Sequence, residues 1–567
     1  MKFIELASYL ERLEKTSSRL EITGILAELF KKSEASEIDK IVYLSLGILA
    51  PNYESVILNL AERMMINVLA QAYDEDPQKI KSLFKNSGDL GNVDQELAKG
   101  GGSGISVSEV YDALISVAKD SGAGSAERKV SGMAKLLERL DLTSVRFVAR
   151  IPVGRLRLGF SEKTVMDALR LASLDQGNDL AEKEIEDAYN IRPDIGYIAR
   201  LVKTGNIKKA APELGVPVVP MLAQRLNSTS EMIKKMGEVS VEPKFDGLRI
   251  FIHFRKPDFI RIFTRNMNSI DAGTFPELDS IGKYIKAKEI ILDTEAVGID
   301  EKREMFLDFQ KTITRRRKHD VAKSASEIPL QFQVFDMLLI DGRNLINEPY
   351  VKRRELLEKA VVNGGLFRVD ENTITKDPEI IKNLHQKYLK MGLEGVVVKR
   401  ANGFYVSGRT GWNWVKMKEE EGKTGKLADT IDCVVMGYTR GRGKRSGFGV
   451  GQFLAGIRDG DIIKTITKVG TGLTDEQFKE LNLRLKKLST LKKPKEYEVH
   501  KDLTPDFWVT PDLIVELAAD EITKSPKHSA GLALRFPRLI RFRDDKNISG
   551  VTTKKEVNEF FRMQKTQ

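Results

Sequence analysis

The sequence predicts a multidomain protein in which an all-α region comes first, a mixed α+β domain follows, and a small antiparallel β-barrel comes last. Three observations lead to this prediction. From Met1 to about Pro212, apolar side chains recur at helical spacing almost throughout. From Pro217 onward, short runs of β-branched and aromatic residues alternate with helical segments. Beyond a polar stretch at 419–426, strand-like runs are separated by glycine-rich turns.

Length and composition exclude several classes of protein. At 567 residues the chain exceeds what one hydrophobic core supports, so we expect about three or four domains. A hydrophobic content of 41% excludes a disordered tail protein. The single cysteine, Cys433, excludes internal disulfides and a zinc site built from cysteines. Because the chain lacks a signal-peptide pattern and any apolar run of about 18 residues, we expect a soluble, intracellular, cytoplasmic protein.

The charge of the chain favours a polyanionic partner. Lys and Arg number 92 against 81 Asp and Glu, which gives a net charge of +11. Nucleic acid is the partner that this balance suggests, although ribosome-bound and simply basic proteins share it.

The helical region, which we place at 1–215, carries one basic segment. Arg155 and Arg157 alternate with Leu156 and Leu158, so both arginines can leave the chain on one face. This arrangement suits contacts with DNA phosphates, and a solvated edge is the alternative.

The middle domain, which we place at 216–425, predicts strands between helices. Pro349 and Pro378 stand at first-turn positions of intervening helices. The strand-like runs lie at 260–264, 290–297, 330–336 and 395–399.

The last domain, at 426–567, predicts a small barrel closed by a helix at 553–562. Its strand-like runs lie at 431–438, 453–457 and 462–469.

A lysine stands in a turn that could present it to a substrate. The stretch 241–250 predicts strand, turn and strand, with Gly247 supplying the bend beside Lys244. A lysine attacks phosphorus only as the free amine, and its reference pKa of about 10.4 keeps it charged unless nearby cations or desolvation lower that pKa. Arg249 or a bound metal ion could do so. Alone, the stretch also fits an ordinary hairpin with a surface lysine.

Further polar and aromatic side chains stand on or beside the middle-domain strands. Arg265 follows one strand, and Asp293 and Glu295 share one face of the next, where Glu295 could bind a metal ion or a hydroxyl group. We place Phe335 at the end of a third strand, where its ring could stack on a base.

Four further residues lie near the end of this domain. Glu394 and Lys399 flank a fourth strand, and Lys416 and Lys418 share one side of a fifth. Singly, each of these residues also fits a core or surface position. Together they suggest a nucleophilic lysine, two acids suited to Mg²⁺, a base platform and a phosphate-binding set.

In order and spacing, these residues resemble the motifs of ATP-dependent DNA ligases, which are covalent nucleotidyltransferases. The likeness is closest to the archaeal and eukaryotic replicative type and covers essentially the whole chain. The matching motifs stand at 242–249, 264–266, 293–295, 335–336, 394–399, 414–418 and 534–546.

The resemblance implies three domains and a three-step reaction. The domains are a helical DNA-binding domain (1–215), an ATP-grasp-like adenylation domain (216–425) and an OB-fold with a C-terminal helix (426–567). Lys244 attacks the α-phosphorus of ATP, AMP passes to the 5′-phosphate of a nick, and the 3′-hydroxyl displaces it. Such nick sealing serves DNA replication, repair and recombination.

The resemblance also implies roles for individual residues. It implies that Glu242 and Phe335 bind the adenine. Arg265 and Glu295 would bind the nucleotide on its ribose side. Glu295 and Glu394 are the candidates for binding Mg²⁺, for which Mn²⁺ can substitute. The phosphate contacts are Arg249, Lys399, Lys416 and Lys418, with Arg409 as a weaker contact. A motif of the barrel domain is placed against ATP in the first step only. Its residues are Arg538, Arg541, Arg543, Asp545 and Lys546.

The implied partner is nicked double-stranded DNA, bound by a monomer. Contact with a sliding clamp is in question, because the sequence at 100–107 replaces the segment that often binds it in relatives. An RNA ligase or mRNA capping enzyme remains an alternative, but it would use GTP or RNA ends and would not need the long helical region. A second alternative is a non-catalytic DNA-binding scaffold, which the intact motifs disfavour. The missing cysteines exclude an NAD-dependent ligase with its zinc finger.

Overall fold

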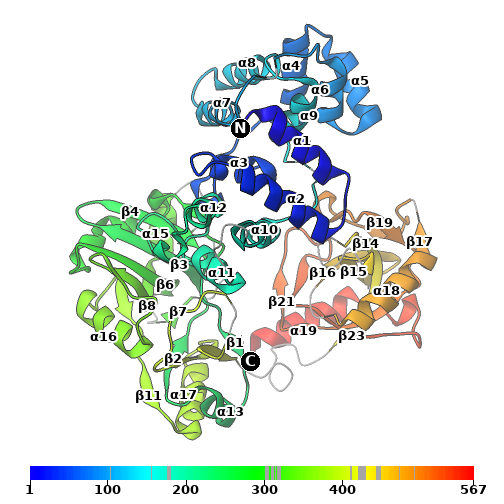
Figure 1. Cartoon of the computed structure of the whole chain (residues 1–567). Helices are drawn as coiled ribbons and strands as arrows, with labels where there is room; N and C mark the ends of the chain where they lie inside the picture. The colour runs from blue at the N-terminus through cyan, green and yellow to red at the C-terminus, as the bar shows by residue number, and fades with distance from the viewer. Residues whose placement is uncertain are drawn as a thin grey trace. The chain divides into compact units, whose positions relative to one another are not determined.

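The computed structural model places the chain in two compact units, Met1–Met417 and Lys418–Gln567 (Figure 1). Arg155, Arg157 and Arg409 lie outside the described residues, so the predictions for them stay predictions. The structure describes residues 1–567 except 103, 155, 157, 175–179, 301–304, 308–311, 313–314, 316–320, 409–410, 419–429, 442–447, 471–472, 491 and 567.

The first unit begins with α-helices only, as the sequence predicts. Local signals set several of their ends: Ser106 and Glu109 form a capping box, and Gly47 ends a helix with a φ of 70°. The helices are α1 (Phe3–Glu14), α2 (Arg19–Lys32), α3 (Ile38–Leu46), α4 (Glu62–Tyr73), α5 (Pro77–Ser87), α6 (Leu90–Leu97), α7 (Val107–Lys119), α8 (Ser125–Leu137), α9 (Leu142–Arg150), α10 (Glu162–Leu174), α11 (Glu182–Ile191) and α12 (Ile195–Lys203).

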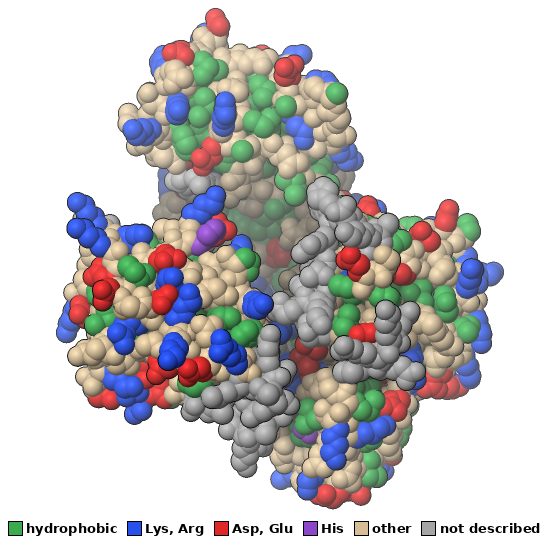
Figure 2. Space-filling view, turned by 180° about the vertical axis from the view of Figure 1, so that it is seen from behind, with side chains coloured by type: hydrophobic (Ala, Val, Ile, Leu, Met, Phe, Trp, Pro, Cys, Tyr) green, Lys and Arg blue, Asp and Glu red, His purple; other side chains and the backbone are tan. Residues whose placement is uncertain are grey.

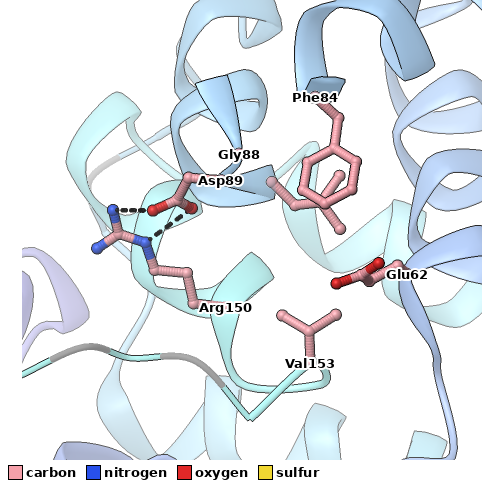
Figure 3. Close-up of a pocket in the computed structure, with 7 residues that line it drawn as sticks. Glu62, Phe84, Gly88, Asp89, Arg150 and Val153 are labelled. Carbon is pink, nitrogen blue, oxygen red and sulfur yellow. Dashed lines mark hydrogen bonds and ion pairs between the residues drawn. The ribbon is translucent and has the colours of Figure 1, made fainter. Parts of the chain in front are cut away.

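A buried arginine ties several of these helices together. Arg150, at the end of α9, donates from Nε and Nη2 to the Asp89 carboxylate at 3.1 and 2.8 Å (Figure 3). It also donates from Nη1 to Glu14 at 2.8 Å. Asp89 also caps α6. The small cavity beside this pair, which Glu62 and Phe84 help to line, has a volume of about 10 Å³, room for about one water molecule. The pair is therefore a structural anchor.

The middle region contains a five-stranded sheet with one apolar and one polar face. Val241, Val398 and Met417 lie on the apolar face, which packs against α13 (Thr229–Met236) and α17 (Pro378–Lys390). Side chains alternate along a strand, so Glu242 and Lys244 belong to the opposite face. The strand order is β1 (Gln224–Arg225), β13 (Trp414–Lys418), β12 (Gly395–Arg400), β2 (Val239–Lys244) and β11 (Thr373–Thr375).

A second, eight-stranded sheet also has one apolar face and one polar face. One face buries Ile250, Leu292 and Val334 in a hydrophobic core, and α16 (Tyr350–Ala360) packs beside β8. The main strand order is β10 (Phe367–Val369), β8 (Leu330–Ile340), β6 (Glu289–Asp300), β3 (Leu248–Arg255), β4 (Phe259–Thr264) and β5 (Ser269–Ile270), with β7 (Met305–Phe306) paired to β6 and β9 (Arg343–Asn344) to β8. A short helix, α15 (Val321–Glu327), precedes β8.

The polar faces of the two sheets meet. Lys399 on β12 donates from Nζ to the carbonyl oxygen of Phe335 on β8 at 2.7 Å. The rings of Phe335 and Trp414, one from each sheet, lie edge to face with centroids 6.0 Å apart. The motif residues that the sequence scatters over the middle region therefore gather between the two sheets.

The second unit contains a curled, mainly antiparallel eight-stranded sheet, a separate two-stranded sheet and, among its described residues, two α-helices. Cys433 lies buried in its core, as predicted for a strand residue. Its elements are β14 (Ile431–Thr439), β15 (Gln452–Asp459), β16 (Ile462–Val469), α18 (Asp475–Leu488), β17 (Ser489–Thr490), β18 (Tyr497–Glu498), β19 (Phe507–Val509), β20 (Ile514–Ala518), β21 (Glu521–Lys524), β22 (Leu532–Arg535), β23 (Arg538–Phe542) and α19 (Lys554–Thr566). The predicted fold class, helical region first and β-rich barrel last, is confirmed. Among the described residues, no helix is long and apolar enough to cross a membrane.

Candidate active site

Lys244 stands at the end of β2, where the polar face opens. Its Nζ lies 2.5 Å from Oε2 of Glu394, and the two side chains are 20% and 21% exposed. The strands bring the two residues together, because Gly395 pairs with Lys244 in the β2–β12 register and the Glu394 amide donates to the Lys244 carbonyl at 3.0 Å. A partly exposed lysine beside a carboxylate is therefore accessible to a substrate.

Two glycines allow the chain to pass close to this lysine. A Cβ on Gly247 would lie 2.4 Å from the backbone oxygen of Ala296 on β6. Gly395 has a φ of +133°, and its Cβ would meet the Met417 oxygen at 2.2 Å. Any other residue at either position would push a strand away from Lys244.

A second lysine–glutamate pair lies deeper on the same sheet. Nζ of Lys399 is 2.5 Å from Oε2 of Glu242, and both side chains are 1% exposed. The Glu242 carboxylate also accepts hydrogen bonds from the hydroxyls of Tyr350 and Ser240. Lys399 lies 4.6 Å from the ring centroid of Trp414, so aromatic faces add to its stabilisation. The sequence predicted Lys399 as a phosphate contact; the structure places it against Glu242.

Phe335 reaches this space through a β-bulge. In the β6–β8 pairing, Asp293 opposes Asp336 and Thr294 opposes Val334, which leaves Phe335 as the extra residue. The prediction that Phe335 and Asp336 end a strand is wrong, because β8 continues to Ile340. The bulge, and not a strand end, aims the ring into the site.

Arg249 faces the site from β3 and is held by a buried acid. It donates from Nε and Nη2 to the Asp293 carboxylate at 2.9 and 2.7 Å, and from Nη1 to the Met221 carbonyl at 2.8 Å. Burial raises the pKa of Asp293, and the Arg249 charge opposes that rise. Tyr405 donates to the same carboxylate at 3.1 Å. Arg249 thus carries a fixed positive charge at the wall of the site.

Glu295 lies opposite Arg249 in the β3–β6 register, on the same face as Asp293. Burial raises the pKa of Glu295 to about 7, the charges of Lys244 and Arg249 lower it, and those of Asp293 and Glu394 raise it. The sequence prediction that Asp293 and Glu295 share a face is confirmed. Near neutral pH this carboxyl group is therefore poised between its two protonation states.

Three further predicted nucleotide contacts lie on β13 and just after β4. Lys416 and Lys418 are partly buried and alternate with the buried Val415 and Met417 along β13, so both lysines share the polar face. Arg265 follows β4 in an exposed turn.

The predicted barrel motif lies on β23, which Arg538 begins, and in the segment that follows β23. Each of its cations pairs with a carboxylate of the same unit: Arg538 with Asp520 at 2.8 Å, Arg541 with Glu516 at 2.7 Å, and Lys546 with Asp432 at 2.6 Å. Arg543 binds Asp545 through two nitrogens, at 2.8 and 2.7 Å.

The residues fit a divalent cation only together with a substrate. Glu295 lies on β6 of one sheet and Glu394 directly precedes β12 of the other, and both acids interact electrostatically with Lys244 and with each other. No group of three or more metal-ligating side chains occurs among the described residues. Mg²⁺ takes one or two protein carboxylates plus phosphate oxygens and water, which matches this pair.

Sequence reasoning missed the residues that hold these groups in place. Asp336 forms a fully buried double hydrogen bond with Arg353 of α16 at 2.8 and 2.8 Å, and Tyr350 of the same helix binds Glu242. The only signal for this was the run of polar residues on a helix that must pack against a sheet.

The surface gives no single basic patch on the face shown in Figure 2. There, Lys and Arg side chains are interspersed with Asp and Glu over the parts that are coloured by type.

Comparison with known proteins matches the chain along nearly its whole length. Three family models match: "DNA ligase N terminus" at 2–170, "ATP dependent DNA ligase domain" at 220–418 and "ATP dependent DNA ligase C terminal region" at 446–546. A "Probable DNA ligase" of Dictyoglomus thermophilum is 38% identical over 582 residues, covering 100% of this chain and 98% of the relative. A "DNA ligase" of Saccharolobus solfataricus is 36% identical, covering 100% and 98%. The solved structure "Pmar-Lig_PreS3" has a TM-score of 0.53 at 18% identity, covering 95% of this chain and 99% of its own.

Proposed function

The chain belongs to the ATP-dependent DNA ligase family, whose activity is the sealing of nicks in DNA, and on this premise we propose that Lys244 is its nucleophile. The observation that carries the proposal is the ion pair of Lys244 with Glu394, partly exposed between two polar sheet faces. Lys399, the other lysine paired on β2 and β12, is 1% exposed. The first lysine is therefore the more accessible of the two to a nucleotide.

In the first step, Nζ of Lys244 forms a bond to the α-phosphorus of ATP while the bond from that phosphorus to the bridging oxygen breaks. Pyrophosphate leaves with the bonding electron pair, and AMP stays on the lysine as a phosphoramide. The lysine ammonium must first lose a proton, and Glu394, 2.5 Å away, is placed to accept it. AMP then passes to the 5′-phosphate of the nick, and the 3′-hydroxyl displaces it.

Fixed positive charge is what these steps need, because charge moves between phosphate oxygens in each. Arg249, held by Asp293, keeps its charge at the wall of the site. Lys416 and Lys418 share the same polar face and are proposed phosphate contacts. Arg265 and Arg409 are proposed to contact the nucleotide.

Glu295 and Glu394, which both interact electrostatically with Lys244, would hold Mg²⁺. When bound there, the ion would neutralise phosphate charge and favour the free amine of the lysine. Glu295 would serve this role as the carboxylate; without the ion, burial raises the pKa of this group to about 7.

The base end of the pocket is proposed to lie at Phe335 and Glu242. The Phe335 ring can stack on adenine, and the Glu242 carboxylate can accept a hydrogen bond from the adenine amino group. Tyr350 and Lys399 already bind that carboxylate, which fixes its orientation before ATP arrives.

We further propose the boundaries 1–215, 216–425 and 426–567 for the three domains, and a monomer acting on nicked duplex DNA. Arg155 and Arg157 would contribute phosphate contacts, so affinity for a nick should fall steeply as salt rises. The barrel residues Arg538, Arg541, Arg543, Asp545 and Lys546 would act on ATP in the first step.

The test is to incubate the protein with Mg²⁺ and α-labelled ATP or GTP, separate it on a denaturing gel, and assay sealing of a nicked duplex in parallel. We expect ATP to label the protein, GTP to leave little label, and Lys244→Ala to abolish both labelling and sealing. Labelling of Lys244→Ala would refute the assignment of the nucleophile. Preferential labelling by GTP would instead favour a capping-type enzyme.

A further inference from the structure

Two acids of the second unit face each other across neighbouring strands. Asp432 on β14 pairs in register with Glu516 on β20, and Glu516 pairs with Arg541 on β23. Their side chains are 13% and 11% exposed. Like charges directly opposite each other destabilise a sheet, so these two carboxylates need cations close by.

The cations come from the predicted barrel motif. Nη1 of Arg543 lies 3.0 Å from Asp432 and 3.4 Å from Glu516, and so bridges the two acids. Lys546 binds the other oxygen of Asp432 at 2.6 Å, and Arg541 binds Glu516 at 2.7 Å. All three cations of the segment 541–546 thus share one pair of acids.

The three cations are not equivalent. Arg543 is 12% exposed, and its Nε and Nη2 bind Asp545, so carboxylates surround its guanidinium group. Arg541 and Lys546 are 63% and 31% exposed and each hold one acid. Arg543 is therefore placed as an anchor, whereas Arg541 and Lys546 can exchange a carboxylate for a phosphate oxygen.

The acids themselves are held by the strands around them. The Asp432 amide donates to the Thr552 hydroxyl at 3.0 Å, and the Thr552 amide donates back to the Asp432 carbonyl at 3.0 Å. Thr430 donates to the free oxygen of Glu516 at 2.8 Å. A rigidly held acid pair can fix the position of a cationic segment, since charge-assisted hydrogen bonds are short and directional.

We propose that Asp432 and Glu516 are positioning residues for the first reaction step, which fix Arg543 so that Arg541 and Lys546 are presented to the phosphates of ATP. The inference rests on the proposed role of this motif in that step. It adds two acids on β14 and β20 that lie outside the motif, and it separates an anchoring arginine from the two cations that touch the substrate.

The test measures two single-turnover rates in the full chain, lysine adenylation by ATP and sealing of a nick whose 5′-phosphate already carries AMP. For Asp432→Asn and Glu516→Gln, we expect adenylation to slow by about 10- to 100-fold, the range for a misplaced reacting group, with sealing unchanged. Asp432→Glu keeps the charge and should recover part of the adenylation rate.

A matched control is Asp459→Asn in the same unit, because Asp459 pairs with Lys464 at 3.0 Å and Lys554 at 3.5 Å, outside the motif. It should leave both rates unchanged. Thermal melting of each variant reports whether the barrel still folds.

The proposal is overturned if adenylation by Asp432→Asn and Glu516→Gln is unchanged or faster, since the acids would then be irrelevant or inhibitory. It is also overturned if both rates fall together with the melting temperature, because that pattern indicates a structural role alone. Lys244→Ala in the same assay keeps the two proposals separate. If that variant is still labelled, the proposed function fails, whatever the acid variants do.

Discussion

Two lysine–glutamate pairs lie along β2 and β12, one of them through Glu394 just before β12, and both have a separation of 2.5 Å, yet they occupy different environments. Lys244 and Glu394 are 20% and 21% exposed at the opening of the polar face. Lys399 and Glu242 are 1% exposed, surrounded by Tyr350 and aromatic rings. Residue type and spacing therefore do not distinguish the lysine proposed as the nucleophile from the lysine paired in the interior; burial and the surrounding partners do.

The largest difference between the two pairs should appear in activity. Lys244→Arg keeps a positive charge beside Glu394, but a guanidinium group does not lose its proton in proteins and cannot attack phosphorus. We expect adenylation and nick sealing to fall to background while urea unfolding changes little, because a partly exposed pair contributes about 0–1 kcal/mol. Residual adenylation with Arg at this position would show that another group is the nucleophile.

The inner pair should matter most for stability. Lys399→Met leaves the Glu242 carboxylate buried without its cation, which costs about 3–5 kcal/mol of unfolding free energy. Urea unfolding followed by tryptophan fluorescence measures it, since Trp414 lies 4.6 Å from Lys399 Nζ. The double variant Glu242→Gln with Lys399→Met should recover part of the loss. A stability equal to that of the unchanged protein would contradict the assignment of this pair as structural.

Tyr350→Phe tests how the inner glutamate is fixed. The change removes the hydroxyl that donates to the buried Glu242 carboxylate, and an acceptor that loses its donor costs about 1–3 kcal/mol. We expect lower unfolding free energy and a higher KM for ATP, with the label still on the protein. Tyr388→Phe is the matched control, because Tyr388 is buried against the apolar face of the same sheet. Equal KM values for ATP in the two variants would show that Tyr350 does not contribute to the ATP pocket.

Glu295, which lies within the electrostatic influence of the outer pair, should confer a pH dependence on activity. With its pKa raised to about 7, the carboxylate proposed to bind the cation becomes protonated as pH falls through 7, so kcat/KM for ATP should fall about tenfold per pH unit below that point. The residual activity of Glu295→Gln should lack this inflection. The free energy of unfolding should change in the opposite direction. Because the folded protein binds the Glu295 proton more tightly than the unfolded chain, the contribution of this group to stability falls as pH rises from 4.5 to 7. A kcat/KM for ATP that does not change with pH would show that Glu295 is not the group that binds the cation.

The sequence sufficed for the fold class and for the shared faces of Asp293 with Glu295 and of Lys416 with Lys418, because strand alternation is a local property. It did not suffice for the pairing of Lys244 with Glu394, which depends on the register of strands far apart in the chain. The bulge that aims Phe335 is one extra residue in a ladder, and no local pattern marks it. Burial by helix α16, which supplies Tyr350 and Arg353, is likewise a tertiary property.

The central claim, that the exposed lysine and not the buried one carries AMP, is tested most directly by locating the adduct. The protein is incubated with ATP and Mg²⁺, digested, and its peptides are sequenced by mass spectrometry under conditions that preserve the phosphoramide. The account predicts one AMP on the peptide containing Lys244 and none on the peptide containing Lys399. AMP on Lys399, or on any residue other than Lys244, would contradict it.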